Sequence, residues 1–444
     1  MMAAAVMPEV EVKPLATRVL GSMLDQRMMT AVDACVRCGI CSESCHYYLA
    51  DPRPENVPAY RAEMVRRVYR SLFDPLGKRL PGWMGVTDLT EATLDQLAEM
   101  AFATCTLCRR CVVNCPMGVD TPYLVRAARA LATAAGRAPQ MLEELAGAAI
   151  AKGESLDLFK DLFAEQVAEM EKDLQGQVGD PQARIPIDKQ GAQVLYVALS
   201  GAHTIMPAAL LFYATGTDWT LSPFEAANYA YFLADPSRAK VITKRIVDEA
   251  TRLGVKEVVV TECGHAYAVL RWEAPNWFET PFAFQVRSLV EVMAQWITEG
   301  SIELDPSRNT DPVTYHDSCN LARNGGIIEE PRTILRAAVS DFIEMTPNRE
   351  NAYCCGGGAG LVAVPEWTDR RLAAGKPKAD QIRRTGAKLV AASCDNCRLQ
   401  LDDLGEHYQL GTTVVGLADL VARALVLPSR GPDHRPDAGP QDLP

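Results

Sequence analysis

The sequence has few basic residues for its length and no long apolar run. Of its 444 residues, 45 are lysine or arginine and 56 are aspartate or glutamate, which gives a formal net charge of -11. An acidic chain without a basic stripe argues against nucleic-acid binding. The longest apolar stretch, residues 205–214, is far shorter than a bilayer requires. We therefore expect neither a nucleic-acid partner nor a transmembrane segment in this chain.

Other common signals are also missing. The amino terminus reads MMAAAVMPEV, without a positive n-region or a cleavage-site pattern, so we expect no export signal. The run GGGAG follows a cysteine pair and does not open a helix after a strand, which disfavours NAD binding. All 14 cysteines belong to the sets described below or lie beside one, so no disulfide framework is left over. This use of cysteine fits a reducing cytoplasm.

Eight cysteines form two runs with the same C-x2-C-x2-C-x3-C spacing, which is typical of 4Fe-4S cubane clusters. The first run is Cys35, Cys38, Cys41 and Cys45, and the second is Cys105, Cys108, Cys111 and Cys115. In the bacterial two-cluster pattern the fourth cysteine of each run binds the other cluster. We therefore assign Cys35, Cys38, Cys41 and Cys115 to one cubane, and Cys105, Cys108, Cys111 and Cys45 to the other. The two runs must then lie side by side.

Zinc and disulfides are the simpler alternatives for these runs. Zinc sites pair two CxxC units and do not pack four cysteines into one short segment, while disulfides need an oxidising compartment. One departure from the pattern is that His46 stands where the second run has Pro116. Neither residue is a ligand in the pattern, so the assignment stands.

The spacing of apolar residues divides the chain into a helical part and an α/β part. Residues 15–170 show helical periodicity, and we expect helices over 22–32, 94–103 and 123–135. About sixty residues separate the two cysteine runs, which suits an α-helical ferredoxin better than a small two-fold one. The polar segment before residue 194 is rich in glycine and proline, as linkers are. We expect a ferredoxin-like domain over 1–175 and a linker over 176–193.

After the linker, short β-rich segments alternate with helices. We expect strands over 194–199, 256–261, 313–315 and 388–392, with helices such as 237–253 and 366–385. This alternation implies parallel sheets. The predicted fold class is therefore α plus α/β: the helical domain is followed by two α/β units, 194–310 and 311–430. Residues 431–444 have the composition of a disordered tail.

Five further cysteines form the pattern C-x34-CCG-x37-CxxC, consisting of Cys319, Cys354, Cys355, Cys394 and Cys397. Cys319 and the CxxC pair follow predicted strands, so they should converge at one end of a parallel sheet, where ligand sites form. The glycines after the CC pair lack Cβ atoms and let backbone and a bulky cofactor approach closely. Alternatives are a zinc site that uses four of the five cysteines, or buried inert cysteines.

This pattern resembles the cysteine-rich CCG domain of heterodisulfide reductase and its relatives. Residues 30–425 are similar to a fusion of the small cluster-bearing subunit with the CCG subunit of that enzyme. The segments TECGHA, YHDSCNLAR and EMTPNRENAYCCGGGAG are most similar to the iron-sulfur subunits of the Dsr, Hmc and Tmc type. The resemblance implies a further 4Fe-4S cluster, cubane or non-cubane, held by the five cysteines and active in disulfide chemistry.

The resemblance also implies partners. These are an integral membrane subunit that carries haem b or reacts with quinone, and a small sulfur-carrier protein with a disulfide or trisulfide. We therefore expect a heterodisulfide reductase-like oxidoreductase subunit that acts on sulfur groups, peripheral on the cytoplasmic face of the membrane. Two alternatives are a non-catalytic electron-transfer subunit, and the iron-sulfur partner of a flavin dehydrogenase for glycolate, lactate or glycerol 3-phosphate. A module with purely structural cysteines is the least favoured alternative.

A similarity between two parts of the sequence bears on the one cysteine not yet assigned, Cys263. VLYVALS from residue 194 aligns with VTYHDSC from residue 313, and GVKEVVVTECGH from residue 254 aligns with GAKLVAASCDNC from residue 386. Glu262 then stands opposite Cys394, and His265 opposite Cys397. We interpret the first unit as a degenerate copy with no cluster of its own. Cys263 is a candidate ligand or substrate-facing thiol, and His265 a candidate proton donor. The alternative is a buried cysteine beside a helix-capping acid and a structural histidine.

Overall fold

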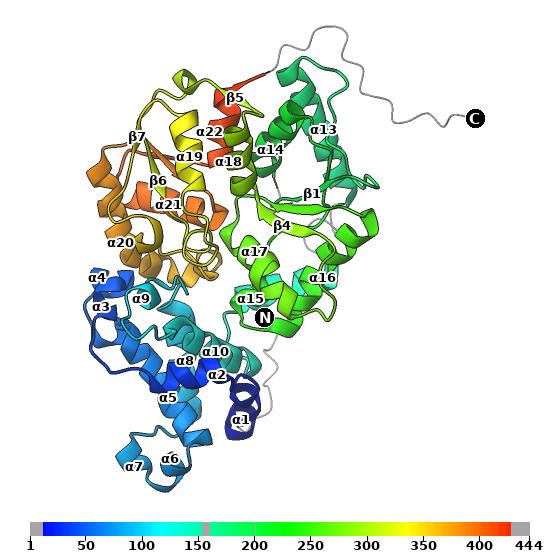
Figure 1. The fold of residues 1–444 in the computed structure, drawn as a ribbon. Helices are drawn as coiled ribbons and strands as arrows, with labels where there is room; N and C mark the ends of the chain where they lie inside the picture. Colours follow the sequence, from blue (N-terminus) through cyan, green and yellow to red (C-terminus); the bar gives the residue numbers. More distant parts are fainter. Residues whose placement is uncertain (1–11, 153–159, 200, 428–444) are drawn as a thin grey trace, which may run out of the picture.

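The computed structural model describes residues 12–152, 160–199 and 201–427 (Figure 1). The tail expected over 431–444 lies outside these residues. As the spacing of apolar residues predicts, helices make up the amino-terminal part of the described chain, and parallel sheets follow. Figure 1 shows the helical part below two α/β units that lie side by side. Across the described residues, no helix combines the length and the apolar character that a membrane span needs.

The helical part has one apolar core. Its elements are α1 (Val12–Ser22), α2 (Gln26–Asp33), α3 (Cys41–Ser44), α4 (His46–Ala50), η1 (Pro54–Asn56), α5 (Pro58–Phe73), α6 (Pro75–Arg79), α7 (Pro81–Met84), α8 (Glu91–Ala103), α9 (Arg110–Val113) and α10 (Thr121–Ala134). The buried faces of α1, α2, α5, α8 and α10 form the core. The helices expected over 94–103 and 123–135 are α8 and α10. The segment 22–32 does not form one helix, because Asp25 caps α2 by accepting a hydrogen bond from the Met28 amide.

Two further helices, α11 (Gln140–Lys152) and α13 (Lys160–Val178), pack away from this core. Phe163 and Val167 of α13 are buried in the core that surrounds the sheets. Leu142 of α11 packs near Phe232 of the first α/β unit. The predicted linker begins inside α13, and Ile185 within it is buried in the same core. Hydrophobic burial therefore attaches α11, α13 and the segment after them to the α/β units.

The two α/β units contain parallel sheets of the same topology. The first sheet has the order β2-β1-β3-β4 and the second β7-β6-β8-β9. The strands are β1 (Val194–Val197), β2 (Trp219–Leu221), β3 (Glu257–Val260), β4 (Gln285–Ser288), β6 (Val313–His316), β7 (Phe342–Ile343), β8 (Leu389–Ala392) and β9 (Thr413–Val415). Tyr196 pairs with Val259 and Tyr315 pairs with Ala391, so the sheets also share their register. A small antiparallel pair joins β5 (Glu303–Leu304) to β10 (Leu425–Val426).

The four predicted strands are the two central strands of each four-stranded sheet. The missed strands are the four edges of these sheets and the short pair β5 and β10. Central strands of a parallel sheet are buried on both faces and read as continuous apolar runs, as the fully buried β1 and β6 do. The edge strand β7 has two residues, neither of them fully buried. Such short edges carry no periodic signal in the sequence.

Helices of the two units pack against each other between the sheets, so both units share one core. The helical elements of this part are α14 (Ala202–Thr215), α15 (Tyr229–Phe232), α16 (Pro236–Leu253), α17 (Gly264–Ala268), η2 (Val269–Glu273), η3 (Ala274–Asn276), α18 (Leu289–Glu299), η4 (Pro306–Arg308), α19 (Glu330–Ala338), η5 (Arg349–Asn351), η6 (Leu361–Ala363), η7 (Pro365–Trp367), α20 (Thr368–Thr385), α21 (Asp395–His407) and α22 (Leu417–Ala424). Helix α14 contacts α22, and α18 contacts α19.

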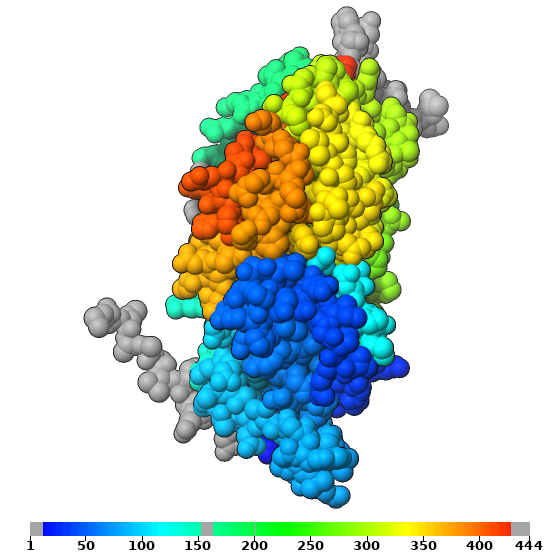
Figure 2. Space-filling view, turned by 90° about the vertical axis from the view of Figure 1, so that its left-hand side faces the viewer, coloured from blue at the N-terminus to red at the C-terminus, as the bar shows by residue number. Residues whose placement is uncertain are grey.

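The helical part is attached to both units through buried contacts. Helix α4 packs on α20, and Figure 2 shows the blue amino-terminal residues directly against the orange and yellow residues of the second unit. The fully buried Arg129 of α10 donates hydrogen bonds to four carbonyl oxygens, those of Ala101, Cys105, Phe232 and Ala359. These acceptors belong to the helical part, the first unit and the second unit. One side chain thus joins all three parts beside the cysteine sites.

Candidate iron-sulfur sites

The first cysteine cavity lies between the loops that follow α2 and α9. Among its lining residues are Cys35, Cys38, Cys41, Cys111 and Cys115. Arg37 and Gly39 have positive φ angles of 56° and 82° in the first run. Leu107 and Arg109, at the same positions of the second run, have φ angles of 54° and 61°. Repeated left-handed residues turn successive backbone N–H groups toward one side, which forms a nest suited to an anionic group.

A second cavity contains Cys105, Cys108 and Cys111 together with Cys45 of the first run. Each cavity thus contains three cysteines of one run together with the fourth of the other, as the crossed ligand assignment requires, and Cys111 lines both cavities. The assignment itself remains a prediction. Arg61 is 2% exposed, and its Nη2 donates to the Cys45 Sγ at 2.8 Å. Burial opposes its charge, but the Cys45 and Cys105 sulfurs outweigh burial and raise the pKa of Arg61.

The two cavities differ in their distance from solvent. Cys38 of the first cavity is exposed, and Cys45 of the second is buried. The apolar side chains of Val36 and Met117, which line the first cavity, are 64% and 49% exposed. The first cavity is therefore the outer site and the second the inner site, next to the α/β units.

The remaining six cysteines are all buried: Cys263, Cys319, Cys354, Cys355, Cys394 and Cys397. We call them the CCG set. Hydrogen bonds from Cys108 and Cys319 lower the pKa of Cys354, and those from Cys354 and Cys397 lower the pKa of Cys355. A hydrogen bond from Cys263, followed by one from Cys397, lowers the pKa of Cys394. The sulfurs of the CCG set therefore form a continuous chain of contacts that begins at Cys108 of the inner site.

The fold explains why these cysteines meet. Cys319 follows β6, and Cys394 ends the connection from β8 and precedes α21. Both lie at the carboxyl ends of neighbouring parallel strands, as expected. In the loop between them, Gly356 has φ of 101°, and a Cβ on Gly357 would lie 2.4 Å from the Val362 side chain. Close packing of protein groups therefore requires these two glycines, in addition to any approach by a cofactor.

Cys263 and His265 lie at the same site. Cys263 precedes α17, and its Sγ lies 3.5 Å from Nδ1 of His265. His265 Nε2 accepts the Asn228 N–H at 3.1 Å, and burial lowers the pKa of His265 to about 4. The imidazole is thus neutral with its proton on Nδ1, directed at Cys263. A proton from His265 would therefore reach Cys263 first.

Glu262 has a different place from the one that the internal alignment suggests. Its carboxylate accepts the N–H groups of Leu417 and Ala418 at 2.9 and 3.2 Å, so it caps α22. The alignment placed Glu262 opposite Cys394, but the residue at the helix start that corresponds to Cys394 is Cys263. The first unit has one more residue between strand and helix, which shifts the register. Glu262 is therefore the helix-capping acid of the alternative interpretation, while Cys263 lies in the CCG set.

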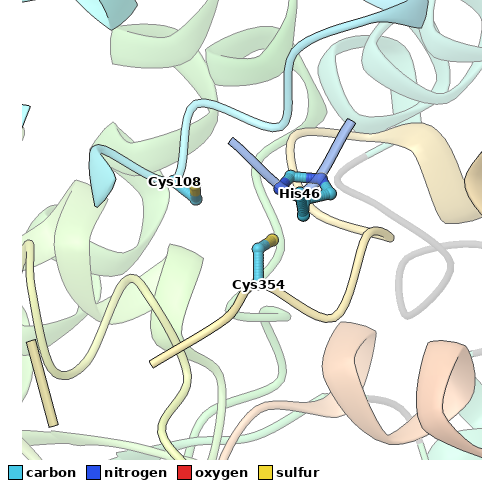
Figure 3. Close-up of side chains that lie close together, drawn as sticks. All are labelled: His46, Cys108 and Cys354. Atoms are coloured by element: carbon cyan, nitrogen blue, oxygen red, sulfur yellow. The ribbon is translucent and has the colours of Figure 1, made fainter. Parts of the chain in front are cut away.

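Two histidines beside the cysteines were not among the sequence candidates. His316, at the end of β6, has a ring nitrogen within 4.8 Å of both the Cys355 and Cys397 sulfurs. Both of its ring nitrogens lack hydrogen-bond partners among the described residues. A ring nitrogen of His46 lies within 4.8 Å of the Cys108 and Cys354 sulfurs, and Figure 3 shows these three side chains directed toward one another. A buried strand end resembles any core position in the sequence, so no sequence signal distinguished His316. His46 could have been noticed, because it stands where the second cysteine run has Pro116.

Buried cations surround the CCG set. Lys378 is almost fully buried, which lowers its pKa to about 8 despite the nearby Asp317 carboxylate. Arg323 donates to the carbonyl oxygens of Cys108 and Ala352. Thiolate-bound clusters are anionic, and buried cations offset part of that charge. The sulfur donors, the nests of backbone N–H groups and the buried cations are together suited to iron-sulfur clusters.

Comparison with known proteins agrees with this chemistry. Residues 31–119 match the 4Fe-4S dicluster domain family, and residues 313–402 match the Cysteine-rich domain family. The chain is 30% identical to the Hdr-like menaquinol oxidoreductase iron-sulfur subunit 2 of Archaeoglobus fulgidus, over 90% of this chain and 80% of the relative. It is 23% identical to a subunit of the dihydromethanophenazine:CoB--CoM heterodisulfide reductase of Methanosarcina mazei, over 92% and 98%. These matches confirm the resemblance drawn from the cysteine patterns.

Proposed function

The chain belongs to the family of Hdr-like iron-sulfur subunits, and from this premise we propose that it relays electrons between a membrane quinone or haem b subunit and a thiol or disulfide substrate. The substrate reacts at the CCG set. A disulfide or trisulfide on a small sulfur-carrier protein is the substrate that we favour, on the cytoplasmic face of the membrane. Membership in the family establishes a redox subunit, and the substrate and the partners are our proposals.

The observation that carries the proposal is the continuous line of cysteine sulfurs. It begins at the exposed Cys38, passes through the outer and inner sites, and reaches the CCG set at Cys354. Bound 4Fe-4S clusters supply one-electron steps whose potentials depend on burial and hydrogen bonding. The CCG set has six cysteines, Cys263 among them, which exceeds the four that a cubane needs. We therefore propose a CCG cluster with a position for a substrate sulfur.

The two ends of the line differ in what can reach them. At the outer site, the exposed side chains of Val36, Ile40 and Met117 surround the loops that carry Cys38 and Cys115. We place the docking of the membrane redox subunit here. At the other end, a cavity of about 760 Å³ lies between the helical part and the α/β units, and Thr106 and Asn320 line it. The Thr106 hydroxyl lies 3.4 Å from the Cys354 sulfur, so one residue separates the cavity from the CCG set.

This cavity favours catalysis over a sealed electron relay, which is the second candidate function. Its lining contains arginines from both parts of the chain, such as Arg18 and Arg323, which would receive an anionic substrate arm. The relay alternative is supported by the burial of all six cysteines of the CCG set. A flavin dehydrogenase as the partner at the outer site is compatible with either function of the CCG set.

The deciding experiment is EPR spectroscopy of the anaerobically purified protein, oxidised with and without a carrier thiol, together with iron and sulfide analysis. We expect about twelve iron atoms per chain, four for each of three clusters. A new paramagnetic signal that depends on thiol would support catalysis at the CCG set. About eight iron atoms, or a third signal that ignores thiol, would favour the relay.

A further inference from the structure

The residue that follows the fourth cysteine differs between the two otherwise matching runs. His46 follows Cys45, and Pro116 follows Cys115. The crossed arrangement places Cys45 at the inner site and Cys115 at the outer site. Pro116 is exposed at the surface, whereas His46 is 3% exposed. The difference in sequence therefore coincides with a difference in place: only the histidine faces the CCG set.

His46 lies where the inner site and the CCG set meet. One of its ring nitrogens, the Cys108 sulfur and the Cys354 sulfur lie within 4.8 Å of one another (Figure 3). The Cys108 sulfur thus has both the His46 ring and the Cys354 sulfur as close neighbours. Nε2 of His46 has no partner among the described residues, although the ring is buried. A buried polar atom without a partner is unusual and calls for a role at its site.

The surroundings of His46 hold it in this place and exclude water. Its ring packs against Tyr47 at a centroid distance of 4.6 Å. Cys45 and Tyr47, on either side of it in sequence, are buried together with Leu361 and Ala374 of the second unit. Nearby, Arg323 bonds to the carbonyls of Cys108 and Ala352 and so links the two cysteine loops. A fixed, dry contact of this kind strengthens a hydrogen bond to a metal ligand.

We propose that His46 is the positioning residue that couples the inner site to the CCG set, by hydrogen bonding to Cys108 and filling the space beside Cys354. The proposal rests on the proposed function, because it requires clusters at both sites. In each transfer the inner site loses one electron and the CCG set gains one, and no proton needs to move at His46. Among the described residues that line the outer site there is no histidine, which explains why Pro116 suffices there.

The test uses the full chain with its clusters and three variants. His46→Leu removes the nitrogens and keeps an apolar side chain, His46→Asn restores an N–H group, and Pro116→Ala changes the matching position of the other run. After flash reduction, rapid freeze-quench EPR follows the arrival of electrons at the CCG set. We expect His46→Leu to slow this step by about 10-fold to 100-fold, the range typical of groups that contact a metal ligand. His46→Asn should recover part of the rate, and Pro116→Ala should retain it. An unchanged rate in His46→Leu, at unchanged iron content, would overturn the proposal.

A second measurement decides the matter even where a variant loses iron. In wild-type protein labelled with 15N-histidine, ENDOR on the reduced inner site should show coupling to one histidine nitrogen, and its absence would refute the contact. His265 contacts Cys263, and His316 lies beside Cys355 and Cys397, so neither accounts for such coupling at the inner site. Neither measurement uses a thiol. An EPR signal of the CCG set that does not change with thiol would therefore refute the proposed substrate chemistry, and the results on His46 could still be interpreted.

Discussion

Replacement of Glu249 by glutamine should stabilise the protein in a strongly pH-dependent way. Glu249 lies in α16, is 4% exposed, and accepts a hydrogen bond from Ser222 through one carboxylate oxygen. The other oxygen has no partner among the described residues. Burial raises the pKa of Glu249 from 4.5 to about 7, although the Ser222 hydroxyl and Arg252 oppose the shift.

The sign of the effect follows from proton linkage. Between pH 4.5 and about 7 the folded protein keeps a proton that the unfolded chain releases, so stability falls as pH rises through this window. A shift from 4.5 to about 7 corresponds to roughly 3 kcal/mol once the folded carboxyl is ionised. About 1 kcal/mol of this cost is present at pH 5 and nearly all of it at pH 8, so about 2 to 3 kcal/mol separates the two conditions.

Apparent melting temperatures of wild type and Glu249→Gln, measured anaerobically at pH 5 and pH 8, test this reasoning. The variant should gain far more at pH 8 than at pH 5. Asp248→Asn is the matched control, because Asp248 is the neighbouring acid on the same helix and is exposed with Lys244 as its partner. An equal change in Glu249→Gln at both pH values, or a pH-dependent gain in the control, would refute a buried carboxyl as the cause.

Three further changes test the sites and their assembly. Cys355→Ala should remove the CCG signal and about four of twelve iron atoms while both ferredoxin-type signals remain; loss of a ferredoxin-type signal would contradict our ligand partition. Cys263→Ala should change the response to thiol more than the iron content if Cys263 is not a ligand, and loss of four iron atoms would make it one. Arg129→Met should leave four carbonyls unbonded and lower the free energy of unfolding by more than about 3 kcal/mol. Urea unfolding at equal iron content would measure this. A loss below about 1 kcal/mol would contradict the view that Arg129 joins the three parts of the chain.

Spacing along the chain was enough to predict several features of this protein. The two cysteine runs indicated two sites, because four sulfurs at this spacing surround one small volume. The central strands were predictable because strands buried on both faces must be apolar along their length. The helices α8 and α10 were predictable for a similar reason, from their apolar faces.

Other features depend on contacts between distant segments, and they became visible only in the folded chain. A single additional residue after β3 places Cys263, and not Glu262, at the position that matches Cys394. No local pattern records such a shift, since helix starts depend on which groups cap them. The packing of α13 against the sheets and the meeting of His46 with Cys354 likewise join residues far apart in the chain. The spacing of cysteines and apolar residues can be read within short segments of the sequence. The contact between the inner site and the CCG set instead arises when separate parts of the chain bury their apolar surfaces together.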